Sequence, residues 1–109
     1  MNVVYGDKVR QFETLLALAE KATERLKEIV GTSQGTATWD LDIDKTGFIT
    51  LSLRLSDWAG SVEGTFTPEE LQHPSQMRIR LLELWGDLLQ ARSHHQLREL
   101  QEAWHGLEQ

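Results

Sequence analysis

The sequence has no cysteine, only two prolines and no long apolar run. Without cysteine, neither a disulfide nor a thiolate ligand for a metal is possible, and this composition fits a reducing compartment. No stretch approaches the roughly 18 apolar residues of a membrane-spanning helix, and the N-terminus lacks an apolar run of signal-peptide length. We therefore expect a cytoplasmic protein that does not associate with a membrane.

Positive charge is also scarce, with 11 Lys and Arg against 17 Asp and Glu and a net charge of -6. This balance argues against non-specific nucleic-acid binding, which needs a basic surface. It suits solubility or attraction to a basic partner. The chain of 109 residues is long enough for a single domain, residues 1–109, with one modest core. Tryptophan is abundant for this length, at Trp39, Trp58, Trp85 and Trp104.

Sequence motifs of enzyme chemistry are missing as well. The sequence shows no nucleophile elbow, glycine-rich phosphate loop or Ser/His/Asp arrangement. Its four histidines lack the i, i+4 spacing of helix-borne zinc sites. We expect no catalytic residue, cofactor or metal, and we favour a protein that is not an enzyme, although the sequence leaves that question open.

One stretch, DIDKTGFIT at residues 42–50, resembles the calcium loop of the EF-hand family, with acids at alternate positions followed by a glycine. Such a loop is flanked by helices and ends with a bidentate Glu at position 12. Here Leu53 occupies that position and cannot bind a metal, and the flanking residues alternate in polarity as strands do. We interpret the stretch as a β-hairpin turn.

Residues 7–30 show the apolar spacing of an amphipathic helix, with Asp7 as the expected N-cap and Gly31 as the C-cap. After a loop at 31–36 the period changes to two. A three-residue turn at 45–47 pairs Ile43 with Ile49 and places all apolar residues on one side. A four-residue loop at 57–60 then pairs Leu55 with Val62. This pattern predicts a three-stranded antiparallel meander with its central strand at 49–55.

The C-terminal third reads as helix. Thr67 and Glu70 form a capping box before a short turn at 68–72, and Pro74 starts the next helix. That helix continues from residue 75 into the low nineties, and an apolar stripe extends to Leu107. One long helix and two hinged helices both fit the pattern. The predicted fold is α+β: an N-terminal helix, the meander, a short turn, then one or two C-terminal helices on one face of the sheet.

Three groups of residues are candidates for partner binding. Trp58 lies at a predicted hairpin tip, where it either anchors a partner or folds back under the sheet. The stripe of Leu97, Leu100 and Trp104 fits a dimer seam or a helix packed on its own core. Gly86, which is not one of these three groups, interrupts the helix and indicates the close approach of Trp39 or another helix. Acidic side chains on an edge strand could meet a basic partner or only discourage strand pairing: Asp40, Asp42 and Asp44.

The sequence favours a non-enzymatic protein-interaction module that forms a homodimer, and its sharper form is an acidic inhibitor or chaperone of a basic partner. The outline of the fold resembles that of several unrelated small bacterial proteins, including secretion chaperones and toxin-neutralising partners. The alternative is a small-molecule-binding protein or enzyme with a Trp-lined pocket between sheet and helices.

Overall fold

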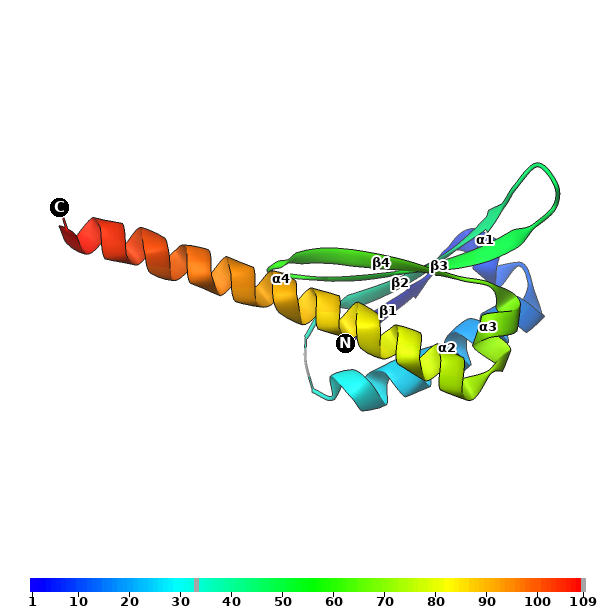
Figure 1. The fold of residues 1–109 in the computed structure, drawn as a ribbon. Coiled ribbons are helices and arrows are strands. Elements are labelled where there is room, and N and C mark those ends of the chain that lie inside the picture. Colours follow the sequence, from blue (N-terminus) through cyan, green and yellow to red (C-terminus); the bar gives the residue numbers. More distant parts are fainter. Residues whose placement is uncertain (33, 109) are drawn as a thin grey trace.

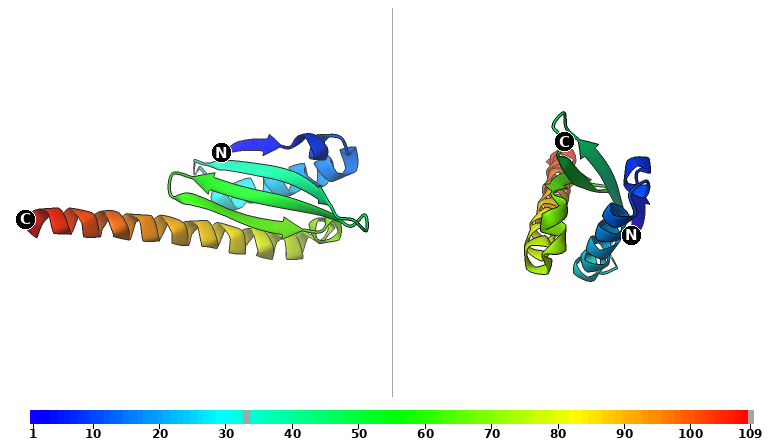
Figure 2. Two further views of the ribbon diagram at one scale, coloured as in Figure 1. Left: turned by 90° about the horizontal axis from the view of Figure 1, so that it is seen from above. Right: turned by 90° about the vertical axis from the view of Figure 1, so that its right-hand side faces the viewer.

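A computed structural model describes residues 1–32 and 34–108, and it describes only the backbone of residues 107 and 108. The fold is α+β, with a four-stranded mixed sheet and a long C-terminal helix (Figure 1). Helices α2 and α4 cover the same face of the sheet (Figure 2). The elements in chain order are β1 (Asn2–Tyr5), α1 (Asp7–Arg10), α2 (Glu13–Val30), β2 (Thr36–Ile43), β3 (Ile49–Asp57), β4 (Gly60–Phe66), α3 (Pro68–Gln72) and α4 (Pro74–Glu108).

The sheet has one strand more than the sequence predicted. Strand β1 pairs with β2 in parallel, with Val3 opposite Ala37 and Tyr5 opposite Trp39. The chain reaches β2 from β1 through α2, as parallel neighbours require. Strand β2 therefore lies between β1 and β3 over Thr36–Trp39, and only its second half, which carries Asp40 and Asp42, extends past β1.

The predicted helix at 7–30 is divided. The short α1 packs against β2 and buries Val9, whereas α2 runs beneath the sheet, so the chain changes direction between them. Phe12 makes this change in an extended conformation, at the N-cap of α2, and its side chain is exposed. The predicted N-cap Asp7 lies inside the first turn of α1, after Gly6. Gly31 ends α2 with a positive φ, as expected.

The antiparallel registers are confirmed. Ile43 pairs with Ile49, and Leu55 pairs with Val62. Gly47 has a φ of 85°, the left-handed conformation that the predicted turn requires. The second hairpin is tighter than predicted, because β3 and β4 stay paired as far as Asp57 and Gly60 and leave a connection of Trp58 and Ala59.

The core lies between the sheet and its two covering helices. At its centre the Trp39 indole donates a hydrogen bond to the Thr23 hydroxyl at 2.9 Å, and that hydroxyl donates to the Ala19 carbonyl at 2.8 Å. These two linked hydrogen bonds give the buried polar atoms of Trp39 and Thr23 partners and fix the sheet against α2. The largest fully buried side chains are Trp39, Phe66, Leu26, Leu51, Leu53, Leu81 and Val9.

Helix α4 is a single unbroken helix, which decides between the two arrangements that the sequence allowed. The capping box before it is present, since the Thr67 hydroxyl accepts from the Glu70 amide and the Glu70 carboxylate accepts from the Thr67 amide. Only the first part of α4 lies along the sheet, and the rest projects beyond it (Figure 1). The molecule consequently measures 59 Å along its longest axis. No helix in the described residues is long and apolar enough to cross a membrane.

Candidate functional site

Helix α4 carries a row of exposed apolar side chains, here named the α4 ridge. These side chains are separated by close to a whole number of helical turns, so they lie on one side of the helix. Leu100 and Trp104 are the most exposed, at 68% and 64%, and both lie in the projecting part. The ridge comprises Ile79, Leu82, Leu89, Leu97, Leu100 and Trp104. Several large apolar side chains exposed on one side of a helix make a candidate interaction site.

Gly86 lies on the ridge between Leu82 and Leu89. A methyl group placed there would meet no atom within 4 Å, its own helix backbone aside, in the part of the chain that is described. The expectation that Trp39 or another helix of the same chain approaches Gly86 is therefore wrong. A glycine inside a helix costs about 1 kcal/mol relative to alanine. Packing within the described chain does not account for this cost.

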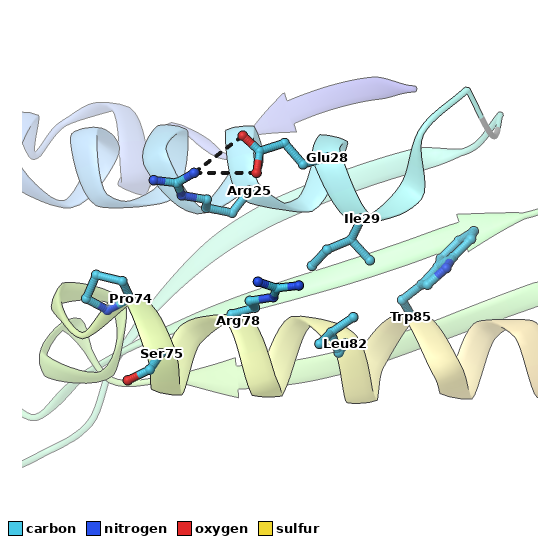
Figure 3. Close-up of a pocket in the computed structure, with 8 residues that line it drawn as sticks. All are labelled: Arg25, Glu28, Ile29, Pro74, Ser75, Arg78, Leu82 and Trp85. Atoms are coloured by element: carbon cyan, nitrogen blue, oxygen red, sulfur yellow. Dashed lines mark hydrogen bonds and ion pairs between the residues drawn. The ribbon is translucent and has the colours of Figure 1, made fainter.

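A groove of about 590 Å³ opens between α2 and α4 beside the ridge (Figure 3). Ile29 on α2 and Leu82 and Trp85 on α4 point into it and form its apolar walls. Arg78 also points into the groove (Figure 3). Arg25 on α2 lies at the same groove and forms an ion pair with Glu28 at 3.4 Å. The groove can therefore accept a large apolar side chain and offers cationic groups beside it.

The β3–β4 hairpin tip holds α4 at the point where the helix leaves the sheet. The Asp57 carboxylate lies 2.5 Å from Nε of Arg92, and the Asp57 side chain is only 2% exposed. Arg92 also stacks 4.9 Å from the centre of the Trp85 ring. Trp58 packs edge-on against His95 with ring centres 5.0 Å apart, although it remains 58% exposed. Trp58 thus contacts the helix and does not enter the core.

The three acidic candidates have different roles. Asp40 and Asp42 are exposed and alternate along β2 with the buried Trp39 and Leu41, so they point away from the core. Asp44 instead folds into the hairpin turn, where Oδ1 accepts hydrogen bonds from the Thr46 hydroxyl at 2.6 Å and the Phe48 amide at 2.9 Å. These hydrogen bonds lower the pKa of Asp44. The described residues include no group of three or more His, Asp or Glu side chains placed to hold a metal.

Glu70 is a second carboxylate with a perturbed environment. The Thr67 amide donates to it within the capping box, and Arg80 forms an ion pair with it. Both contacts stabilise the ionised form, and the amide makes the larger contribution, so the pKa of Glu70 falls below its usual value. Arg80 also stacks on Phe66, with its guanidinium 4.5 Å from the ring centre. Glu70 therefore joins α3 to α4 and serves the fold.

The predicted partner-binding residues Leu97, Leu100 and Trp104 share one side of α4. Trp58 packs against His95, just before Leu97 in the same helix. The side chain of Leu107, which extends the predicted stripe, lies outside the described part of the chain. Sequence reasoning did not bring Ile29 and Arg78 together in a groove, because their proximity depends on how α2 and α4 lie on the sheet. No protein-family model, curated protein or solved structure matches the chain. The function is therefore inferred from the site alone.

Proposed function

We propose that the protein is a non-enzymatic protein-interaction module that forms a homodimer through the α4 ridge. The observation that carries the proposal is the row of exposed apolar side chains on a helix that projects past its own domain. Isolated apolar residues are normal on a protein surface, but several large ones on the same side of one helix are costly to leave in water. Association would remove this surface from solvent.

The positions of the polar groups support a role without catalysis. The two carboxylates with lowered pKa values, Asp44 and Glu70, belong to a turn and a helix cap, and neither lines the groove. Glu28, which does line it, is paired with Arg25. A catalytic acid or base would need a pKa tuned toward neutrality next to a substrate cavity, and the lowered pKa values of Asp44 and Glu70 lie in the opposite direction, away from the groove.

Light scattering at several protein concentrations tests the homodimer, with two variants that add the same charge to α4. Leu100→Asp places a carboxylate on the ridge, and His105→Asp places one on another side of the same helix. We expect the wild type and His105→Asp to approach the mass of a dimer as concentration rises, and Leu100→Asp to remain a monomer. A wild type that stays monomeric at several hundred micromolar would contradict the proposal.

An acidic inhibitor or chaperone of a basic partner is the sharper form of this function. Its support is the net charge of -6 and the exposure of Asp40 and Asp42 on the side of β2 that points away from the core. Capture from a native lysate at low and high salt, with Asp40→Asn/Asp42→Asn and Trp58→Ala beside the wild type, tests it. Charge-driven binding should weaken with salt and with the double variant. If the captured partner is retained equally at high salt and by the Asp40→Asn/Asp42→Asn variant, this form of the function is ruled out.

The groove gives a second candidate function, the binding of a small molecule. Its volume of about 590 Å³ suits a ligand, and Trp85 supplies an aromatic wall. Arg25 and Arg78 would favour an anionic compound with an apolar body. A melting temperature that rises with fatty acids, and less so in Arg78→Gln, would support this function. An unchanged melting temperature across the series would count against it.

A further inference from the structure

We propose that the second copy lies antiparallel along α4, about a two-fold axis at Ser93, and that its Trp104 fills the groove between α2 and α4. This inference rests on the proposed homodimer and adds its geometry. In a two-fold interface the same patch serves both subunits, so the patch must be complementary to itself. The α4 ridge meets this condition if the two-fold axis passes next to Ser93.

The ridge is symmetric in sequence about Ser93. Leu89 and Leu97 lie four residues to either side, and Leu82 and Trp104 lie eleven residues to either side. In an antiparallel pair centred on Ser93, Leu89 faces the partner's Leu97 and Leu82 faces the partner's Trp104. At 1.5 Å per residue, that last contact lies about 16 Å from the axis on each side. The part of α4 that projects from one copy thereby covers the part that lies along the sheet in the other.

Gly86 fits the same register, because the partner's Leu100 stands at the matching distance of seven residues from Ser93. The absence of a side chain at Gly86, where no atom of the described chain outside the local helix backbone lies within 4 Å of an added methyl group, leaves room for the partner's Leu100. The two helices can then approach closely enough for the partner's Trp104, one turn further along, to enter the groove beside Leu82. A parallel pair would instead set Gly86 against Gly86, which leaves a gap, and Trp104 against Trp104, which crowds two large side chains together.

The groove lies where this arrangement brings the indole. Leu82 belongs to both the α4 ridge and the groove, so a side chain opposite Leu82 borders Ile29 and Trp85. A tryptophan buries on the order of 150–250 Å² and favours apolar walls with a polar group at one edge. Arg78 points into the same groove and can stack its guanidinium on the ring.

The ridge also lacks charge that would oppose self-association. From Ile79 to Trp104 its positions hold leucine, isoleucine, glycine, serine and tryptophan, whereas charged neighbours such as Asp87 and Arg98 fall on other sides of the helix. Ser93, at the centre, is small and exposed. A small residue at the crossing point lets two helices approach closely.

Cysteine crosslinking tests the register, and the chain offers a clean background because it has no cysteine. Under mild oxidation, Ser93→Cys should form a covalent dimer, whereas His94→Cys, turned about 100° around the helix, should not. A mixture of Leu89→Cys and Leu97→Cys should give a crosslinked pair, and neither alone should crosslink. Rapid crosslinking of Leu89→Cys alone would indicate a parallel pair and overturn the inference.

Gly86→Leu separates this geometry from unspecific association. The substitution lengthens the apolar row, so unspecific contact would strengthen, but it occupies the space opposite the partner's Leu100 and holds the partner's Trp104 away from the groove. We expect the dimer dissociation constant to rise at least tenfold while circular dichroism shows an intact fold. Tighter association, or a dimer without the Ser93→Cys crosslink, would remove this register and leave the homodimer standing. A monomeric wild type by light scattering would instead remove both.

Discussion

The two halves of α4 belong to one helix and yet depend on different contacts. The proximal half, residues 74–92, has two apolar sides: the ridge, and a row buried against the rest of the domain at Met77, Leu81, Leu84 and Leu88. In the distal half, residues 93–106 of which the side chains are described, no side chain is buried. An isolated helix of this length is marginally stable in water. The distal half therefore gains little from its own domain, and a partner on the ridge would supply the missing contacts.

The boundary between the halves coincides with the tip of the β3–β4 hairpin. Asp57 and Arg92 pair there, and Trp58 and His95 pack together. One turn further along α4, Glu99 lies 3.1 Å from His95 on the same helix. The hairpin tip thus sets the direction in which the distal half projects. Direction matters because an interface spread over both halves needs a straight helix.

The largest expected difference is in the response to a cavity. Leu81→Ala removes a fully buried side chain of the proximal half, and we expect it to lower the free energy of unfolding by about 2–5 kcal/mol. Leu100→Ala removes an exposed side chain of the distal half and should change it by less than about 0.5 kcal/mol in dilute monomer. Urea denaturation of both variants makes the measurement. Similar losses of unfolding free energy in the two variants would show that both halves of α4 are packed against the domain to the same extent.

Breaking the ion pair at the boundary should have the next largest effect. Arg92→Leu leaves the Asp57 carboxylate nearly buried and without its charged partner, which should cost roughly 2 kcal/mol because Arg92 itself is partly exposed. A double-mutant cycle with Asp57→Ala separates this coupling from lost packing on Trp85. A coupling energy near zero would mean that the pair does not hold the helix to the hairpin.

The start of the proximal half depends on the cap of the preceding α3. Thr67→Ala removes the hydroxyl that accepts from the Glu70 amide, and we expect a loss of about 1 kcal/mol in the free energy of unfolding. Thr67→Ser keeps that acceptor and serves as the control. Thermal unfolding of the two variants should place the serine protein close to the wild type. Equal losses in both would point to the lost methyl group of threonine as the cause.

The same division between local and distant contacts explains what the sequence could predict. Alternating polarity determined the register of Ile43 with Ile49, and helical spacing identified Leu97 and Leu100, because each signal lies within neighbouring residues. Strand β1 was missed, since it has four residues and pairs in parallel with a strand that follows a whole helix. The groove between α2 and α4 was not predicted for a similar reason, because Ile29 and Leu82 line the same groove only once both helices lie on the sheet.

The smallest expected effect concerns Glu70 and depends on pH. Its pKa is lowered below the usual 4.5, so its ionised form stabilises the fold above that pH, and the contribution is lost as pH falls through the lower value in the folded protein. Glu70→Gln keeps an acceptor for the Thr67 amide but removes the charge beside Arg80. Both side chains are about one-third exposed, so the expected loss at pH 7 is below about 1 kcal/mol. Thermal unfolding should show this difference at pH 7 and none near pH 2, and a difference that stays constant with pH would mean that shape, not charge, joins α3 to α4.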